Sequence, residues 1–263
     1  DQGRLTKKSD EMIRDHRGVD LRVAPFVIWV HGPSGTGKSE LIPHLASFLA
    51  KNNGLKSSVY NHVVGSKYYD LLDGHDFMVF DDFLNTIDEN FDTLAGQYLQ
   101  ICNRGQLSLP RSAVEDKKTN DKLPVFMITS NFERFDGRSA KIVIPDAYNR
   151  RVHIRVKVEW KDPVSHQDQE YKQYLPDSKT GKPNKVRGAG WEHANISYST
   201  DLGETYVNCN LAELLTKINS NYAEHVIKEQ KAFKQRVIEL NDCINAAAVK
   251  STSFSDYFKQ IAP

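Results

Sequence analysis

The sequence lacks any apolar run of the roughly 18 residues that a membrane-spanning helix requires, and it shows no signal peptide. Cysteine is also scarce, with only Cys102, Cys209 and Cys243 among 263 residues. Their spacing is not that of a metal site, so we expect reduced, partly buried thiols in a cytosolic protein. Because the sequence begins at Asp1 rather than at methionine, we expect a fragment or a processed product, and an anchor could lie outside it.

The chain also lacks an excess of charge of either sign. It contains 35 Lys and Arg residues against 34 Asp and Glu residues, for a net charge of +1. This balance excludes a protein that coats nucleic acid through its overall charge, so any nucleic-acid contact must come from local clusters. The length is sufficient for a core without disulfides, either as one large domain or as a core with an appendage.

One motif carries most of the functional information. Residues 32–39 read GPSGTGKS and fit G-x-x-x-x-G-K-[ST], the pattern of a phosphate-binding loop. Glycines let the backbone turn so that successive N–H groups face phosphate oxygens. We expect Lys38 to contact the β- and γ-phosphates and the Ser39 hydroxyl to bind Mg²⁺. The predicted nucleotide-binding residues are Gly32, Pro33, Ser34, Gly35, Thr36, Gly37, Lys38 and Ser39.

The residues around this loop agree with that interpretation. The run FVIWV before it is continuously apolar, as expected for a strand over 26–31 that is buried on both faces. Apolar residues recur at helical spacing from Leu41 to Leu49, which predicts the helix that should follow a phosphate-binding loop. Pro43 conflicts with that helix, because it removes the hydrogen bond to the Ser39 carbonyl.

A second apolar run, FMVF, ends in two acids, as in a Walker B motif. We expect Asp81 to hold Mg²⁺, directly or through water, and Asp82 to orient or deprotonate the attacking water. A third run leads into Thr129, Ser130 and Asn131. The Asn131 amide can both donate and accept hydrogen bonds, so it can contact the γ-phosphate and fix the water. The alternative for Asn131 is an Asx-turn at the end of a strand.

Two adjacent arginines, Arg150 and Arg151, precede a strand in which apolar and basic residues alternate. A nucleotide bound between subunits needs a cation from the neighbour, and we assign that arginine-finger role to at least one of the pair. On the strand itself, Arg155 and Lys157 are expected to lie on a solvated basic face of an edge strand.

The chain divides into four parts by composition. Residues 1–20 form a polar arm, 21–160 alternate strands and helices as in an α/β sheet, 161–200 read as a polar insertion or hairpin, and 201–263 are helical. The predicted strands are 26–31, 58–64, 77–81, 124–130 and 151–159.

Two features stand out in the last part. Asn210 and Glu213 have the spacing of a capping box that opens a helix. After Ser253, apolar residues at helical spacing predict a short helix that docks on its own domain or inserts into a neighbouring subunit. They are Phe254, Tyr257, Phe258 and Ile261.

Together these motifs resemble the superfamily 3 helicases, and specifically the 2C-type ATPase of picornaviruses and picorna-like RNA viruses. The resemblance covers roughly residues 22–160. The stretches that carry it are GPSGTGKS at 32–39, FMVFDDF at 77–83, SAVEDKK at 112–118, ITSNF at 128–132 and AYNRRVHIRV at 147–156.

The resemblance implies an AAA+-like P-loop NTPase with a parallel central sheet flanked by helices, acting as a hexameric ring with active sites between subunits. It implies ATP with Mg²⁺, and a role in RNA replication with other viral proteins in the host cytoplasm, at virus-remodelled membranes. Lys38, Asp82, Asn131, Arg150 and Arg151 then correspond to the catalytic residues. Arg111, Lys117 and Lys118 fall where the family places loops that contact single-stranded RNA. The terminal apolar residues resemble the family's oligomerisation helix. Many members carry a cysteine-rich zinc site, but these cysteines do not cluster, so we expect no structural zinc.

Two other functions fit part of the pattern. Replication-initiator helicases of small single-stranded DNA viruses share the phosphate-binding loop, the acidic pair and the TSN run, but they add a nickase domain with paired histidines, which this sequence does not contain. A nucleotide-gated scaffold of membranes or replication complexes would bind ATP with little turnover.

Overall fold

The computed structural model describes residues 22–63, 66, 68–72, 74–84, 91–105, 107, 109, 110, 112, 122–135, 144–161, 191 and 193–261. The predicted arm, the three cations assigned to RNA contact and residues 162–190 lie outside these ranges.

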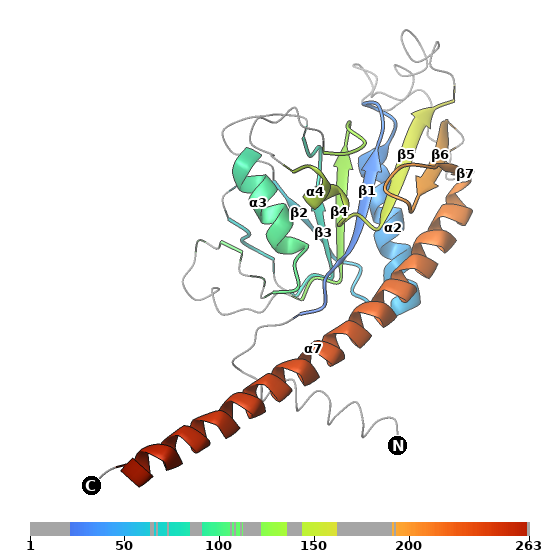
Figure 1. Ribbon diagram of the computed structural model, residues 1–263. Helices are drawn as coiled ribbons and strands as arrows, with labels where there is room; N and C mark the ends of the chain where they lie inside the picture. The colour runs from blue at the N-terminus through green and yellow to red at the C-terminus, as the bar shows by residue number, and fades with distance from the viewer. Residues whose placement is uncertain are drawn as a thin grey trace.

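A seven-stranded sheet in the order β2-β3-β4-β1-β5-β6-β7 forms the centre of the described structure (Figure 1). The first five strands in this order pair in parallel. The β5–β6 and β6–β7 pairs are antiparallel. The strands are β1 Phe26–His31, β2 Val59–His62, β3 Phe77–Phe80, β4 Val125–Ser130, β5 Ile154–Trp160, β6 Ala194–Ser199 and β7 Val207–Cys209. The five strands predicted from sequence are thereby confirmed to within a few residues at their ends.

Among the residues that the structure describes, four helices accompany the sheet: α2 Lys38–Asn53, α3 Phe91–Ile101, α4 Asp146–Asn149 and α7 Leu211–Ile261. Alternate residues of the central strand β1 serve two separate cores, because successive side chains of a strand point to opposite faces. Ile28 and Val30 pack with α2 and α7, whereas Val27 and Trp29 pack with α3. The sheet is therefore covered on both faces, as the continuous apolar runs predict.

Glycine defines both ends of α2. Gly37 at its start has φ 96° and Gly54 at its end has φ 67°, both in the left-handed region that glycine adopts without strain. Pro43 lies inside this helix, and its neighbours Leu41, Ile42 and Leu45 are buried. The helix predicted after the phosphate-binding loop is confirmed, and the proline does not end it.

The structure corrects the position of Arg155. This residue was expected on a solvated edge, but β5 lies between β1 and β6, and Arg155 is only 1% exposed. Lys157, two residues further along the same face, is partly exposed and pairs with Glu159 at 2.9 Å. The reason for the error is that β6 and β7 join the sheet beyond residue 160, where the sequence is polar. β5 and β6 pair in antiparallel orientation. The insertion or hairpin predicted for 161–200 falls mostly outside the described residues and stays a prediction.

Helix α7 begins as predicted. The Asn210 side chain accepts from the Glu213 N–H at 2.9 Å, and the Asn210 N–H donates to the Glu213 carboxylate at 2.9 Å. Leu214, Ile218 and Tyr222 then bury against the sheet. The prediction of a separate short helix that starts after Ser253 is wrong, because those residues belong to α7, which is continuous for 51 residues.

The carboxyl-terminal half of α7 extends away from the sheet (Figure 1). The terminal apolar side chains lie outside the described side chains, so their docking stays a prediction. Within the described residues, no helix is long and apolar enough to cross a membrane.

Candidate nucleotide-binding site

The predicted phosphate-binding loop connects the end of β1 to the start of α2. Gly32 has φ 146°, and a Cβ at this position would lie 2.0 Å from the carbonyl oxygen of Val158. Only glycine fits such a close approach of two backbones. Gly35 and Gly37 also have positive φ, 80° and 96°. The loop geometry therefore depends on all three glycines of the motif.

The Lys38 ammonium lies inside this loop. Its Nζ donates to the carbonyl oxygens of Gly32 at 3.0 Å and Pro33 at 2.9 Å, and to Oδ1 of Asn131 at 2.9 Å. The residue is buried, and this desolvation lowers the pKa of Lys38 against the opposing attraction of Asp82 and Asp81. The lysine of the first motif and the asparagine of the third thus meet, as expected from their places at the carboxyl ends of neighbouring strands.

The second motif joins the same site through Asp81. The Ser39 Oγ donates to Asp81 Oδ1 at 2.8 Å, and the Thr129 hydroxyl donates to the same oxygen. Thr129 also accepts from the Asp82 N–H at 2.9 Å, and Asp82 has φ 52°, which is unusual for a residue with a side chain. The two predicted metal ligands, Ser39 and Asp81, therefore lie side by side.

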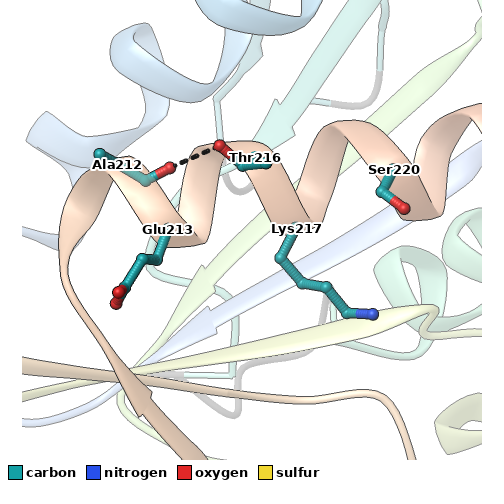
Figure 2. Close-up of a pocket in the computed structure, with 5 residues that line it drawn as sticks. All are labelled: Ala212, Glu213, Thr216, Lys217 and Ser220. Carbon is teal, nitrogen blue, oxygen red and sulfur yellow. Dashed lines mark hydrogen bonds between the residues drawn. The ribbon is translucent and has the colours of Figure 1, made fainter.

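A small cavity of about 140 Å³ opens beside Ser39 and Asp81 and extends to Pro43 and Asn61. A second, open depression of about 480 Å³ lies elsewhere, along α7 alone (Figure 2). It is lined by Ala212, Glu213, Thr216, Lys217 and Ser220, and the Thr216 hydroxyl donates to the Ala212 carbonyl at 2.9 Å. None of these residues belongs to a predicted nucleotide-binding motif, so the smaller cavity is the one associated with the candidate site.

The arginine pair is not part of this cluster within the chain. Arg150 is exposed at the end of α4. Arg151 is held within the chain, because its guanidinium donates to the Ala147 carbonyl and, at 3.3 Å, to Oδ1 of Asn103. The structure therefore brings together Lys38, Ser39, the acidic pair and Asn131, and leaves the arginines apart.

Three further residues lie in or beside the site, and the sequence analysis gave them no role there. Thr129 connects the two acids, as described above. His193 Nε2 must donate to the Thr36 carbonyl, 3.0 Å away, since a carbonyl only accepts. His31, directly before the loop, lies 2.9 Å from the Tyr206 hydroxyl. Thr129 and His31 each adjoin a motif, which is a usable signal, but nothing in the sequence places His193 near residue 36.

His31 is neutral in this environment. Burial lowers its pKa to about 3, and the cations Lys157, Arg155 and Lys38 act in the same direction. A neutral imidazole adds no positive charge beside the Lys38 ammonium.

No cluster of His, Cys, Asp and Glu that could hold a metal ion occurs among the residues described by the structure. The three thiols are free, with Cys102 buried and Cys243 exposed. The expectation that zinc is absent stays a prediction.

Comparison with known proteins finds one matching family model and several relatives. A family model described as RNA helicase matches residues 28–132, which contain the first three motifs. The genome polyprotein of Salivirus A is 33% identical over 148 residues, which cover 55% of this chain and 6% of that polyprotein. The replicase polyprotein of Acute bee paralysis virus is 28% identical over 209 residues, covering 72% of this chain and 11% of the relative. The genome polyprotein of Human parechovirus 2 is 26% identical over 243 residues, covering 86% and 10%. The chain thus spans a small part of the length of each relative.

Proposed function

We propose that the chain is a Mg²⁺-dependent ATPase that remodels RNA in viral genome replication. Residues 28–132 match a family model described as RNA helicase, and the chain resembles the superfamily 3 helicases of picorna-like viruses. The observation that carries the proposal is the convergence of three motifs on one site. The Lys38 ammonium bonds to Asn131, and Ser39 bonds to Asp81, although these residues are 93 and 42 positions apart in sequence.

The residues present fit ATP and Mg²⁺. Two oxygen ligands suited to Mg²⁺, the Ser39 hydroxyl and the Asp81 carboxylate, lie 2.8 Å apart. The three glycines shape a loop whose backbone can turn N–H groups toward phosphate oxygens. When bound, Mg²⁺-ATP supplies a phosphoryl group and a metal that neutralises its negative charge.

The chain's own groups then have distinct roles. Lys38 is already surrounded by three oxygen atoms, and it would exchange one of them for a phosphate oxygen. Asp82 orients or deprotonates the attacking water, and Asn131 holds the water in line. Thr129 keeps Asp81 and the Asp82 backbone in fixed relation, because its hydroxyl bonds to both.

We also propose that a neighbouring subunit completes the site, in the hexameric ring that the resemblance implies. The exposure of Arg150 supports this arrangement. Its side chain is available to a partner, whereas Arg151 is anchored to Ala147 and Asn103 in its own subunit. We assign the direct contact with the neighbour's nucleotide to Arg150 and a supporting role to Arg151. Mixing Arg150→Ala with Lys38→Ala subunits should then restore part of the activity, and absence of rescue in rings shown to mix would contradict the assignment.

Single-stranded RNA and other viral replication proteins are the proposed partners, in the cytoplasm of an infected cell. Arg111, Lys117 and Lys118 are the proposed RNA contacts. RNA-stimulated hydrolysis that disappears when the two lysines are replaced by alanine would support them, and equal stimulation of that variant would exclude them.

Phosphate release from ATP with Mg²⁺ tests the proposed activity. Lys38→Ala, Asp82→Asn and Asn131→Ala should each lose most of the wild-type rate. The exposed residues Lys51 and Asn52 on α2 provide matched controls, and their alanine variants should behave as wild type. Near wild-type rates in the three site variants would rule out the proposal, and tight ATP binding without hydrolysis would favour a scaffold.

A further inference from the structure

The buried Arg155 connects two segments that are distant in the sequence. Its Nε donates to the Glu133 carbonyl at 3.4 Å. Its Nη2 donates to the Asn149 carbonyl at 3.3 Å and to the Asn149 side-chain oxygen at 3.4 Å. One guanidinium therefore joins the loop after β4 to helix α4.

Both segments carry residues of the proposed active site. Glu133 lies two residues after Asn131, and Asn149 directly precedes Arg150. The same segments are joined a second time by Asn149. Its Oδ1 accepts from the Phe135 N–H at 3.1 Å, and its Nδ2 donates to the Phe135 carbonyl at 3.0 Å. The loop that holds Asn131 and the helix that directly precedes the arginine pair are thus bonded to each other and to β5.

The surroundings leave this junction little freedom. The Tyr206 hydroxyl donates to Glu133 Oε1 at 3.2 Å and also contacts His31. A Cβ at Gly203 would come within 2.8 Å of Glu133 Oε1 and 3.3 Å of the Arg155 side chain. The turn before β7 therefore packs directly on the junction, and a movement of one segment must displace the other.

Burying a guanidinium costs hydration free energy, whereas an apolar side chain would fill the same space without that loss. The advantage of the guanidinium here is geometric. The planar guanidinium donates in several fixed directions at once, whereas the single ammonium of a lysine does not reproduce that fork.

We propose that Arg155 is a positioning residue that fixes the Asn131 loop and the Arg150–Arg151 pair as one unit. The inference rests on the proposed function, which gives those residues their roles. Through this unit, a displacement of Asn131 by one subunit's nucleotide moves Arg150, which faces the neighbour's nucleotide, together with its supporting residue Arg151. Arg155 itself touches neither nucleotide.

The test separates hydrolysis from nucleotide binding in the full chain. Arg155→Gln should lower kcat by about 10²-fold, the size expected when reacting groups are misplaced by about 1 Å. The affinity for a fluorescent ATP analogue should stay within about twofold, because Lys38 and the glycine loop are unchanged. Arg155→Lys keeps the charge and loses the fork, so it should stay impaired. Lys157→Gln removes a charge from the same face of β5 and serves as the matched control, with a kcat near wild type.

Double variants distinguish positioning from a general structural defect. If Arg155 acts through the proposed active-site residues, Arg155→Gln should add little to the loss in Asn131→Ala, or in the Arg150→Ala, Arg151→Ala double variant. Losses that multiply in both backgrounds would overturn the proposal.

Folding and activity are controlled separately. If Arg155→Gln does not fold, Asn149→Ala carries the same predictions, because Asn149 is only half-buried and makes the parallel bonds to Phe135. A wild-type chain without hydrolysis would defeat the proposed function itself. A wild-type chain that hydrolyses ATP, with Arg155→Gln or Asn149→Ala at the same kcat, would overturn only the role of Arg155.

Discussion

The two ends of the parallel strands both bury polar side chains, but they use them differently. At the carboxyl end, side chains bond to one another, as Ser39 does to Asp81. At the amino end, histidines bond to the backbone. His153 Nδ1 accepts from the Val27 N–H at 2.9 Å, and His225 Nε2 donates to the Ala24 carbonyl at 2.9 Å.

The amino end serves to hold α7. The rings of His153 and His225 lie 4.2 Å apart between β5 and α7. Beside them, Glu229 of α7 pairs with Arg104 at 2.5 Å. The comparison teaches that buried polar groups alone do not identify a site. The polar groups at the carboxyl end gather around the glycine loop and the small cavity beside Ser39 and Asp81, whereas those at the amino end join α7 to the rest of the chain.

The largest expected effect is on the carboxyl end. Lys38→Ala should lower the rate of phosphate release by about 10²–10³-fold, since it removes a charge-stabilising donor. The melting temperature of this variant should change little. The loss of the Lys38 hydrogen bonds destabilises the fold, but the cost of burying a charge disappears with them. Calorimetry alongside the rate assay checks this, and a large drop in melting temperature would mean that the residue is structural.

The amino end should respond in the opposite way. Glu229→Ala leaves Arg104 and Arg236 without their shared carboxylate, so the free energy of unfolding should fall by about 1–2 kcal/mol, a modest value because Arg104 is half exposed. Phosphate release per folded molecule should be unchanged. Glu224→Ala, at an exposed position on the same helix, is the control. Denaturant titration checks the stability, and lost activity in folded Glu229→Ala would break the distinction between the two ends.

Acid should weaken the amino end through His153. Burial lowers the pKa of His153 from 6.5 to about 3, so on acidification the unfolded chain takes up the proton first. The stability is therefore complete above about pH 6.5 and falls as the pH drops toward 3, by at most about 1.4 kcal/mol per pH unit for this group. His153→Gln should reduce the slope of unfolding free energy between pH 6 and 5. An unchanged slope would show that His153 does not contribute.

The smallest effect on activity is expected for Tyr206, which lies beside the proposed site. Tyr206→Phe removes a hydroxyl that bonds to His31 and Glu133 beside the proposed site. A neutral hydrogen bond contributes about 0.5–1.5 kcal/mol, so the variant should fold and lose only a few-fold in kcat. Steady-state kinetics measure this, and a loss as large as that of Lys38→Ala would place Tyr206 among the essential groups.

Much of this organisation was predictable. The glycine loop, the acidic pair and Asn131 follow apolar runs, and parallel strands bring their carboxyl ends to one edge of a sheet. The burial of Arg155 was not predictable, because β5 became an interior strand only through β6, whose sequence is polar. The contact of His193 with Thr36 depends on the same packing, because His193 directly precedes β6.

The sequence by itself determined the local geometry of the phosphate-binding loop, because its glycines permit backbone angles that other residues resist. It also determined the start of α7, since a capping box needs only residues three positions apart. Only the tertiary structure decided which basic residues are buried and which segments they join. Burial depends on neighbouring strands from distant parts of the chain, and no local pattern records them.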